Sequence, residues 1–180
     1  MRRAVFIDRD GVINHLVNRD GQMVSPRKSS EFELIPKAVD AINRLNMEGW
    51  TCVVVTNQPD LSRGLMPVEE LKRMHEALIS QVGFIEIRVC PHDDVDNCSC
   101  RKPLPGLILQ AASELEIELS DSWMIGDRIS DMHAGIDSGC KAILIKNGQS
   151  TLEEIKNAGL SEVPLADSLW DAIDGFISKK

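Results

Sequence analysis

The chain has 180 residues, of which 43% are hydrophobic and 27% charged, as expected of a soluble globular protein with a single domain over residues 1–180. Its formal net charge of -8 excludes broad binding to nucleic acids or anionic membranes, because both need basic surfaces. No apolar run is long enough to span a bilayer, and Asp8 interrupts the N-terminal run before a signal-peptide core forms. We therefore expect a cytoplasmic monomer.

Short apolar runs alternate with amphipathic helical patterns along the chain. The strand-like runs cover residues 4–7, 52–56, 85–89, 123–125 and 142–145. The helical patterns cover residues 36–49, 67–79, 105–117, 132–139, 152–158 and 169–177. This alternation predicts an α/β fold, a doubly wound (Rossmann-like) parallel sheet with helices on both faces. The longest irregular stretches, 14–35 and 90–104, are long enough to be functional loops.

The first apolar run leads into two carboxylates, Asp8 and Asp10, and a turn at Gly11. Because side chains alternate along a strand, Asp8 and Asp10 can face one cleft while Arg9 points away. Two carboxylates this close repel each other unless a cation lies between them or one holds a proton. The pair indicates a divalent metal, acid–base chemistry or both, although an isolated pair is also compatible with a surface turn.

Two further predicted strands end in polar segments. Thr56 and Asn57 offer a hydroxyl and an amide that suit phosphoryl oxygens, although such a pair alone is typical of a simple turn. Asp127 adds a carboxylate for a hard cation, and Asp131 follows one helical turn later, a spacing also found at helix N-termini. Since parallel strands all point the same way, these segments meet at one edge of the sheet, where ligands of such folds bind.

A group of thiols and an imidazole follows the third predicted strand, at Cys90, His92, Cys98 and Cys100. This is the ligand set of a closed tetrahedral Zn²⁺ site; a redox pair or unligated thiols are the alternatives. Zinc here would be structural, because the polar loop 93–97 cannot bury enough apolar surface to order itself. Arg101 and Lys102 follow directly, and a lysine there could stabilise the charge of a transferring phosphoryl group.

Four motifs in chain order resemble those of the haloacid dehalogenase superfamily of phosphatases. They are Asp8-x-Asp10-Gly11, Thr56-Asn57, Lys102-Pro103 and Gly126-Asp127-x-x-x-Asp131. The resemblance implies that Asp8 attacks phosphorus to form an aspartyl-phosphate, while Asp10 acts first as general acid and then as base. It also implies a catalytic Mg²⁺ held by Asp8, the backbone carbonyl of Asp10, and Asp127.

The same resemblance assigns roles to the surrounding polar residues. Thr56, Asn57 and Lys102 would bind the phosphoryl oxygens. Asp131 would orient Lys102 or a metal-bound water. Because the first strand and first helix leave no room for an inserted cap domain, we expect an open cleft that selects substrates with its loops.

The segment Cys-Pro-His followed by Cys-x-Cys-Arg-Lys-Pro is similar to one subgroup of that superfamily, the D-glycero-D-manno-heptose 1,7-bisphosphate 7-phosphatases and their relatives, the histidinol-phosphate phosphatases. A small phosphorylated sugar or similar metabolite is then the expected partner, with loss of the 7-phosphate from the heptose bisphosphate preferred. Arg101 and Arg128 are candidates for binding a second phosphate.

Two departures from this subgroup leave the substrate open. Pro59-Asp60 stands where a small Ser-Gly pair is common, and the interval from His92 to Cys98 is short. Histidinol phosphate therefore stays an alternative. A phospho-acceptor signalling domain, which is not an enzyme, is a further alternative, although it has no use for a zinc loop.

Overall fold

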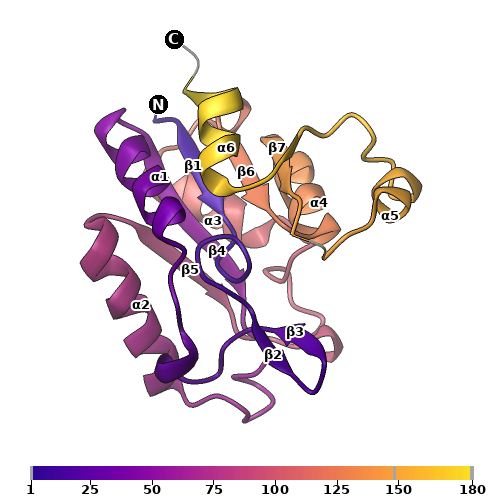
Figure 1. Ribbon diagram of the computed structural model, residues 1–180. Helices are drawn as coiled ribbons and strands as arrows, with labels where there is room; N and C mark the ends of the chain where they lie inside the picture. Colours follow the sequence, from indigo (N-terminus) through magenta and orange to yellow (C-terminus); the bar gives the residue numbers. More distant parts are fainter. Residues whose placement is uncertain (1, 148, 179–180) are drawn as a thin grey trace.

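A six-stranded parallel sheet forms the centre of the protein in a computed structural model that describes residues 2–147 and 149–178. Its strand order is β5-β4-β1-β6-β7-β8 (Figure 1). The strands are β1 (Ala4–Ile7), β4 (Thr51–Asn57), β5 (Glu86–Cys90), β6 (Trp123–Gly126), β7 (Lys141–Ile145) and β8 (Leu165–Ala166). At the end of β1, Ile7 pairs with Val54 of β4 and Ile125 of β6, so the segments after these strands lie at one edge.

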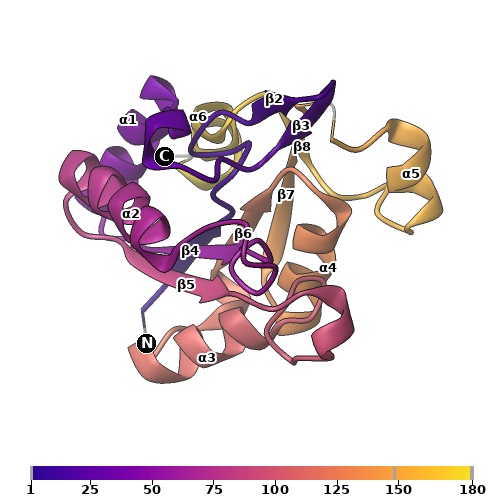
Figure 2. The same cartoon turned by 90° about the horizontal axis from the view of Figure 1, so that it is seen from below.

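Helices cover both faces of this sheet, which confirms the doubly wound α/β fold. One face packs against α1 (Pro36–Met47), α2 (Val68–Val82) and α6 (Leu169–Ala172), and the other against α3 (Gly106–Leu115), α4 (Ile129–Ser138) and α5 (Leu152–Asn157). Figure 2 shows α1 and α6 on the opposite side of the sheet from α3 and α4. Alternation in β1 accounts for this, because Val5 and Ile7 join the first core and Ala4 and Phe6 the second.

The helix boundaries follow local sequence signals. Helix α1 begins at Pro36, whose fixed φ and missing N–H suit a first helical position. Helix α4 ends at Gly139, which has a φ of 95° that favours glycine. The predicted last helix over 169–177 is only partly regular, since α6 passes into the π-helical turn η4 (Ile173–Ile177).

Residues between β1 and α1 fold as a small hairpin that the sequence pattern did not predict. It consists of β2 (Val17–Arg19) and β3 (Gln22–Val24), followed by the 3₁₀ turn η1 (Ser29–Glu31). The hairpin leads to Ser25, which lines the cavity at the sheet edge. Along the described part of the chain, no helix combines the length and apolar character needed to cross a membrane.

Candidate active site

The predicted site residues converge on one cavity of about 350 Å³ at the carboxyl edge of the sheet. Those that line it are Asp8, Asp10, Thr56, Asn57, Arg101, Lys102, Arg128 and Asp131. Asp127 lies behind this surface and is only 1% exposed. Because these residues lie at the ends of β1, β4 and β6 or in the loop after β5, the topology of the sheet brings them together.

Lys102 and three carboxylates form the charged centre of this cavity. The Nζ of Lys102 lies 2.7 Å from Oδ1 of Asp8 and 2.6 Å from Oδ1 of Asp131, and it also donates to the carbonyl of Val55. One oxygen each from Asp8, Asp127 and Asp131 lies within 4.8 Å of the others. Three buried carboxylates therefore share a single lysine.

Burial dominates the electrostatics of this cluster. It raises the pKa of Asp8 to about 8, with help from the nearby Asp131 and Asp127 and against the attraction of Lys102. Burial, followed by the charge of Asp131, raises the pKa of Asp127 to about 6. The Oδ1 atom of Asp127 is buried and has no hydrogen-bond partner among the described residues. An oxygen set with excess negative charge and a free, buried lone pair fits a hard divalent cation such as Mg²⁺.

Asn147 holds the other oxygen of Asp127. Its Nδ2 donates to Asp127 Oδ2 at 2.6 Å and to the carbonyl of Gly11 at 3.1 Å. Gly11 has a φ of 86°, and a Cβ there would lie 2.3 Å from Asp127 Oδ2. Glycine is therefore required at this turn, both for its positive φ and because no Cβ fits beside Asp127. The sequence pattern did not point to Asn147, although it lies just beyond the end of β7, at the strand edge where the other site residues were predicted.

A second network, made of hydrogen bonds to its carboxylate, holds Asp10. Arg9 grips it at two points, with Nε 3.0 Å from Oδ1 and Nη2 3.0 Å from Oδ2. Gln58 and Asn14 donate further hydrogen bonds at 2.7 and 3.1 Å. Burial by itself would raise the pKa of Asp10, but Arg9 and these donors hold it below its usual value. Arg9 does not line the cavity; it is fully buried, and its guanidinium ends on the carboxylate of its neighbour Asp10, which does.

The amide of Asn57 fastens the loop that carries Lys102. Its Nδ2 donates to the carbonyl of Lys102, and its Oδ1 accepts from the backbone N–H of Lys102. Thr56 accepts a hydrogen bond from Gln58, which also donates to Asp10. The side chain of Asn57 thus uses both of its polar groups on the backbone of Lys102, and the contacts of Thr56, Asn57 and Lys102 with phosphoryl oxygens stay predictions.

The two candidate arginines border the cavity with different partners. Arg101 pairs with Asp94 at 2.5 Å and donates to the carbonyl of His92. Arg128 reaches Gln149 at 3.4 Å through its side chain, while its backbone N–H donates to Asp131. Arg128 is therefore free of any carboxylate partner among the described ion pairs, and Arg101 is tied to the cysteine loop.

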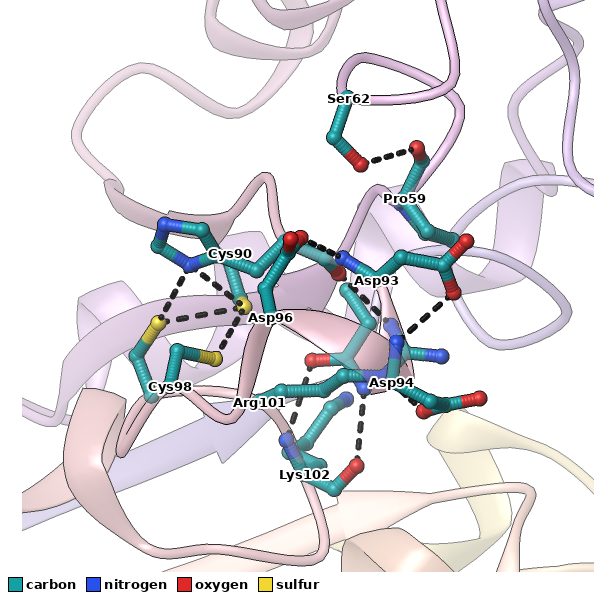
Figure 3. Close-up of polar contacts among 12 residues, drawn as sticks. Pro59, Ser62, Cys90, Asp93, Asp94, Asp96, Cys98, Arg101 and Lys102 are labelled. Atoms are coloured by element: carbon teal, nitrogen blue, oxygen red, sulfur yellow. Dashed lines mark hydrogen bonds and ion pairs between the residues drawn. The ribbon is translucent and has the colours of Figure 1, made fainter.

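The thiols and imidazole predicted as zinc ligands lie together in the loop that follows β5 (Figure 3). The nitrogen Nδ1 of His92 is 3.3 Å from Sγ of Cys100, and Cys90 is 3.7 Å from Cys98. All four candidate ligand atoms lie within 4.8 Å of one another. Sulfur atoms at about 2.3 Å from a tetrahedral zinc are separated by about 3.8 Å. The donor set and its spacing fit a closed Zn²⁺ site, and none of the described cysteines forms a disulfide.

Acidic residues between the cysteines connect this loop to its surroundings. Asp93 caps the 3₁₀ turn η2 (Asp94–Asp96) and pairs at two points with Arg63, which follows β4. Asp94 pairs with Arg101 (Figure 3). The loop thus fixes one arginine beside the cavity and another on the neighbouring segment.

Comparison with known proteins reveals related enzymes. A family model described as HAD-hydrolase-like matches residues 99–172. The D-glycero-beta-D-manno-heptose-1,7-bisphosphate 7-phosphatase of Pseudomonas aeruginosa is 37% identical over 153 residues, covering 82% of this chain and 83% of that protein. The enzyme of the same name from Bordetella bronchiseptica is 36% identical over 159 residues, covering 84% of this chain and 86% of that protein.

Solved structures of heptose bisphosphate phosphatases are also similar to this chain. The D,D-heptose 1,7-bisphosphate phosphatase from B. bronchiseptica, crystallised with magnesium and phosphate, has a TM-score of 0.83 and 31% identity, covering 99% of both chains. The D,D-heptose 1,7-bisphosphate phosphatase from Burkholderia thailandensis has a TM-score of 0.72 and 27% identity, covering 99% of this chain and 100% of that one.

Proposed function

The chain belongs to the heptose 1,7-bisphosphate 7-phosphatase family of haloacid dehalogenase-type hydrolases, and from that premise we propose that it removes the 7-phosphate of D-glycero-β-D-manno-heptose 1,7-bisphosphate. The observation that carries this proposal is the contact of Lys102 with Asp8 and Asp131 beside Asp127, at the edge of an open cavity. We assign the chain a single phosphatase domain without a cap.

In the first chemical step, a carboxylate oxygen of Asp8 attacks phosphorus while the bond from phosphorus to the C7 oxygen of the sugar breaks. Asp10 gives its proton to the departing oxygen, so the sugar leaves as an alcohol. Lys102 and the hydroxyl of Thr56 donate to the phosphoryl oxygens as charge shifts onto them. Asp8 now carries the phosphoryl group as a mixed anhydride.

In the second step, Asp10 takes a proton from a water molecule as that water attacks phosphorus. The bond between phosphorus and Asp8 breaks, which frees inorganic phosphate and restores the Asp8 carboxylate. Arg9, by lowering the pKa of Asp10, favours the ionised form that this base step requires. The first step needs the protonated form of Asp10, so Asp10 must gain its proton before the sugar departs.

The residues that would hold Mg²⁺ are Asp8, Asp127 and the backbone carbonyl of Asp10. When bound, Mg²⁺ neutralises the repulsion between the anionic carboxylates and the anionic phosphoryl group. Asp131 keeps Lys102 directed at Asp8, and Asn147 fixes the orientation of Asp127.

For the cysteine loop we propose a structural Zn²⁺ bound by Cys90, His92, Cys98 and Cys100. All four positions of a tetrahedral ion are then filled by protein, which leaves none for substrate. Its role is to hold Arg101 and Lys102 against the cavity, since these residues directly follow the last ligand. Arg101 and Arg128 would bind the phosphate that stays on the sugar, with Arg128 the freer of the two.

Steady-state assays with the heptose bisphosphate and with histidinol phosphate test the proposal. We expect Mg²⁺-dependent turnover, a kcat/KM at least 100-fold higher for the heptose bisphosphate, and heptose 1-phosphate as product. Equal or higher kcat/KM for histidinol phosphate would reassign the substrate. No turnover of any phosphate ester with Mg²⁺ present would instead support a phospho-acceptor domain.

A further inference from the structure

A line of contacts runs from the half-buried His75 on helix α2 to the buried carboxylate of Asp10. The ring nitrogen Nε2 of His75 lies 3.1 Å from Nη1 of Arg9. The remaining two nitrogens of the same guanidinium hold both oxygens of Asp10. Arg9 has no exposed surface, and its guanidinium carbon lies 5.5 Å from the ring centroid of Phe32. Arg9 is therefore clamped between the helix and the active site.

The chemistry of this contact fixes the state of His75. An arginine can only donate hydrogen bonds, so Nε2 of His75 must accept, and the ring proton must lie on Nδ1. Burial, then the charge of Arg9, lowers the pKa of His75 to about 4, which keeps the ring neutral at neutral pH. Arg9 is buried and has Asp10 as its carboxylate partner. Its remaining nitrogen, Nη1, needs a hydrogen-bond acceptor, and a neutral His75 supplies one.

We propose that His75 is a positioning residue for phosphate-ester hydrolysis: it holds the guanidinium of Arg9 in the plane in which that group orients the Asp10 carboxyl toward the departing oxygen. This inference rests on the proposed role of Asp10. Nη1 of Arg9 lies at the opposite end of the guanidinium from the edge that meets Asp10, so an acceptor there resists rotation of the whole group. Without it, the two-point grip on Asp10 loosens.

Two amide variants separate this role from packing. In His75→Gln, the longer amide can place its oxygen where Nε2 lay and restore the acceptor. In His75→Asn, the same group is too short to reach Arg9. His133→Asn, a half-buried histidine on α4, is the matched control. Thermal melting of each Mg²⁺-loaded protein checks folding, and His75→Leu replaces His75→Asn if the latter does not fold.

The readout is the dependence of kcat/KM on the leaving group. Phenyl phosphate releases a basic oxygen that needs a proton, whereas p-nitrophenyl phosphate releases a much weaker base that leaves without one. We expect His75→Asn to lower kcat/KM by about 10-fold for phenyl phosphate and by less than about 2-fold for p-nitrophenyl phosphate, because only proton donation is impaired. His75→Gln and the control should stay within about 2-fold of the original protein on both esters.

Three results would overturn the inference. They are an equal loss on both esters, no loss on either, or a His75→Gln variant as impaired as His75→Asn. Failure of the proposed phosphatase chemistry is seen separately, because the unaltered protein would then hydrolyse neither ester, and the steady-state comparison of the two metabolites decides the natural substrate.

Discussion

Lys102 Nζ lies 2.7 Å from Asp8 Oδ1 across 94 residues of chain, and this contact joins the segment after the cysteine loop to the end of the central strand. It is the only lysine contact that Asp8 makes among the described ion pairs, while Asp127 and Asp131 lie within reach of the same point. The centre of the site therefore holds more negative charge than the protein itself neutralises.

Replacing Asp8 by Asn should abolish turnover and stabilise the metal-free protein. The folded-state pKa of Asp8 is raised from 3.8 to about 8, so the contribution of Asp8 to the stability of the metal-free wild type is fully present below pH 4 and is lost as pH rises toward 8. Asp8→Asn does not ionise, and its Tm advantage should grow over that window to roughly 5 °C or more. Thermal melts from pH 4 to 9 in a chelator measure it, with Mg²⁺ expected to narrow the gap. A pH-independent difference would contradict this picture.

Replacing Arg9 by Met should move the acidic limb of the pH profile of kcat to higher pH. Arg9 lowers the pKa of Asp10, and the base step uses the ionised carboxylate, so activity is lost as pH falls through that pKa. Removing the adjacent cation should raise the pKa of Asp10, and the limb should move with it. Arg44→Met, which removes an arginine paired with Glu48 and Asp174, is the control and should leave the limb in place. An unshifted limb in Arg9→Met would show that Asp10 does not titrate in kcat.

Replacing Asn147 by Ala should weaken the binding of Mg²⁺ without removing activity. Asn147 holds Asp127 Oδ2 at 2.6 Å and so keeps Oδ1 directed at the cluster. Loss of a residue that orients a metal ligand typically costs about 10-fold or more in metal affinity. We expect a comparable rise in the Mg²⁺ concentration at half-maximal rate, with kcat at saturating Mg²⁺ within about 2-fold. Asn43→Ala on α1 is the control, and equal Mg²⁺ curves for both variants would rule out the role.

Replacing Cys98 by Ala should release zinc and cripple turnover. The loop it anchors carries Asp94, which pairs with Arg101, and it precedes Lys102. Elemental analysis by mass spectrometry would give about one zinc per chain before the change and much less after it. Cys140→Ser, which alters a buried thiol outside the cluster, should keep its zinc. Full activity in a zinc-free Cys98→Ala variant would show that catalysis does not need zinc in this loop.

Much of this fold could be predicted because its signals are local. The buried strand β1 reads as an apolar run, and the polar residues that follow β1, β4 and β6 are identified by the ends of those runs. The hairpin of β2 and β3 was missed because strands of three residues are too short to show a period. Strand β8, with two residues, was missed for the same reason.

The contacts that tune the site depend on partners far away in the chain. The pattern of the first strand gave no sign that Arg9 is buried, which needs His75 from 66 residues away as an acceptor. The pairing of the Asn57 amide with the backbone of Lys102, 45 residues on, was likewise not predicted, and its expected role toward phosphoryl oxygens stays a prediction. Such pairings exist only once the sheet has assembled, so no local pattern encodes them.

The claim on which the whole account depends is that Asp8 carries the phosphoryl group covalently. Rapid mixing with the heptose bisphosphate and Mg²⁺, acid quenching within milliseconds and reduction with borohydride would convert an aspartyl-phosphate into homoserine, which peptide mass spectrometry can locate. We predict homoserine at position 8, only when substrate and Mg²⁺ are both present, and none in Asp8→Asn. Turnover with no homoserine at position 8, or with homoserine at another aspartate, would contradict the account.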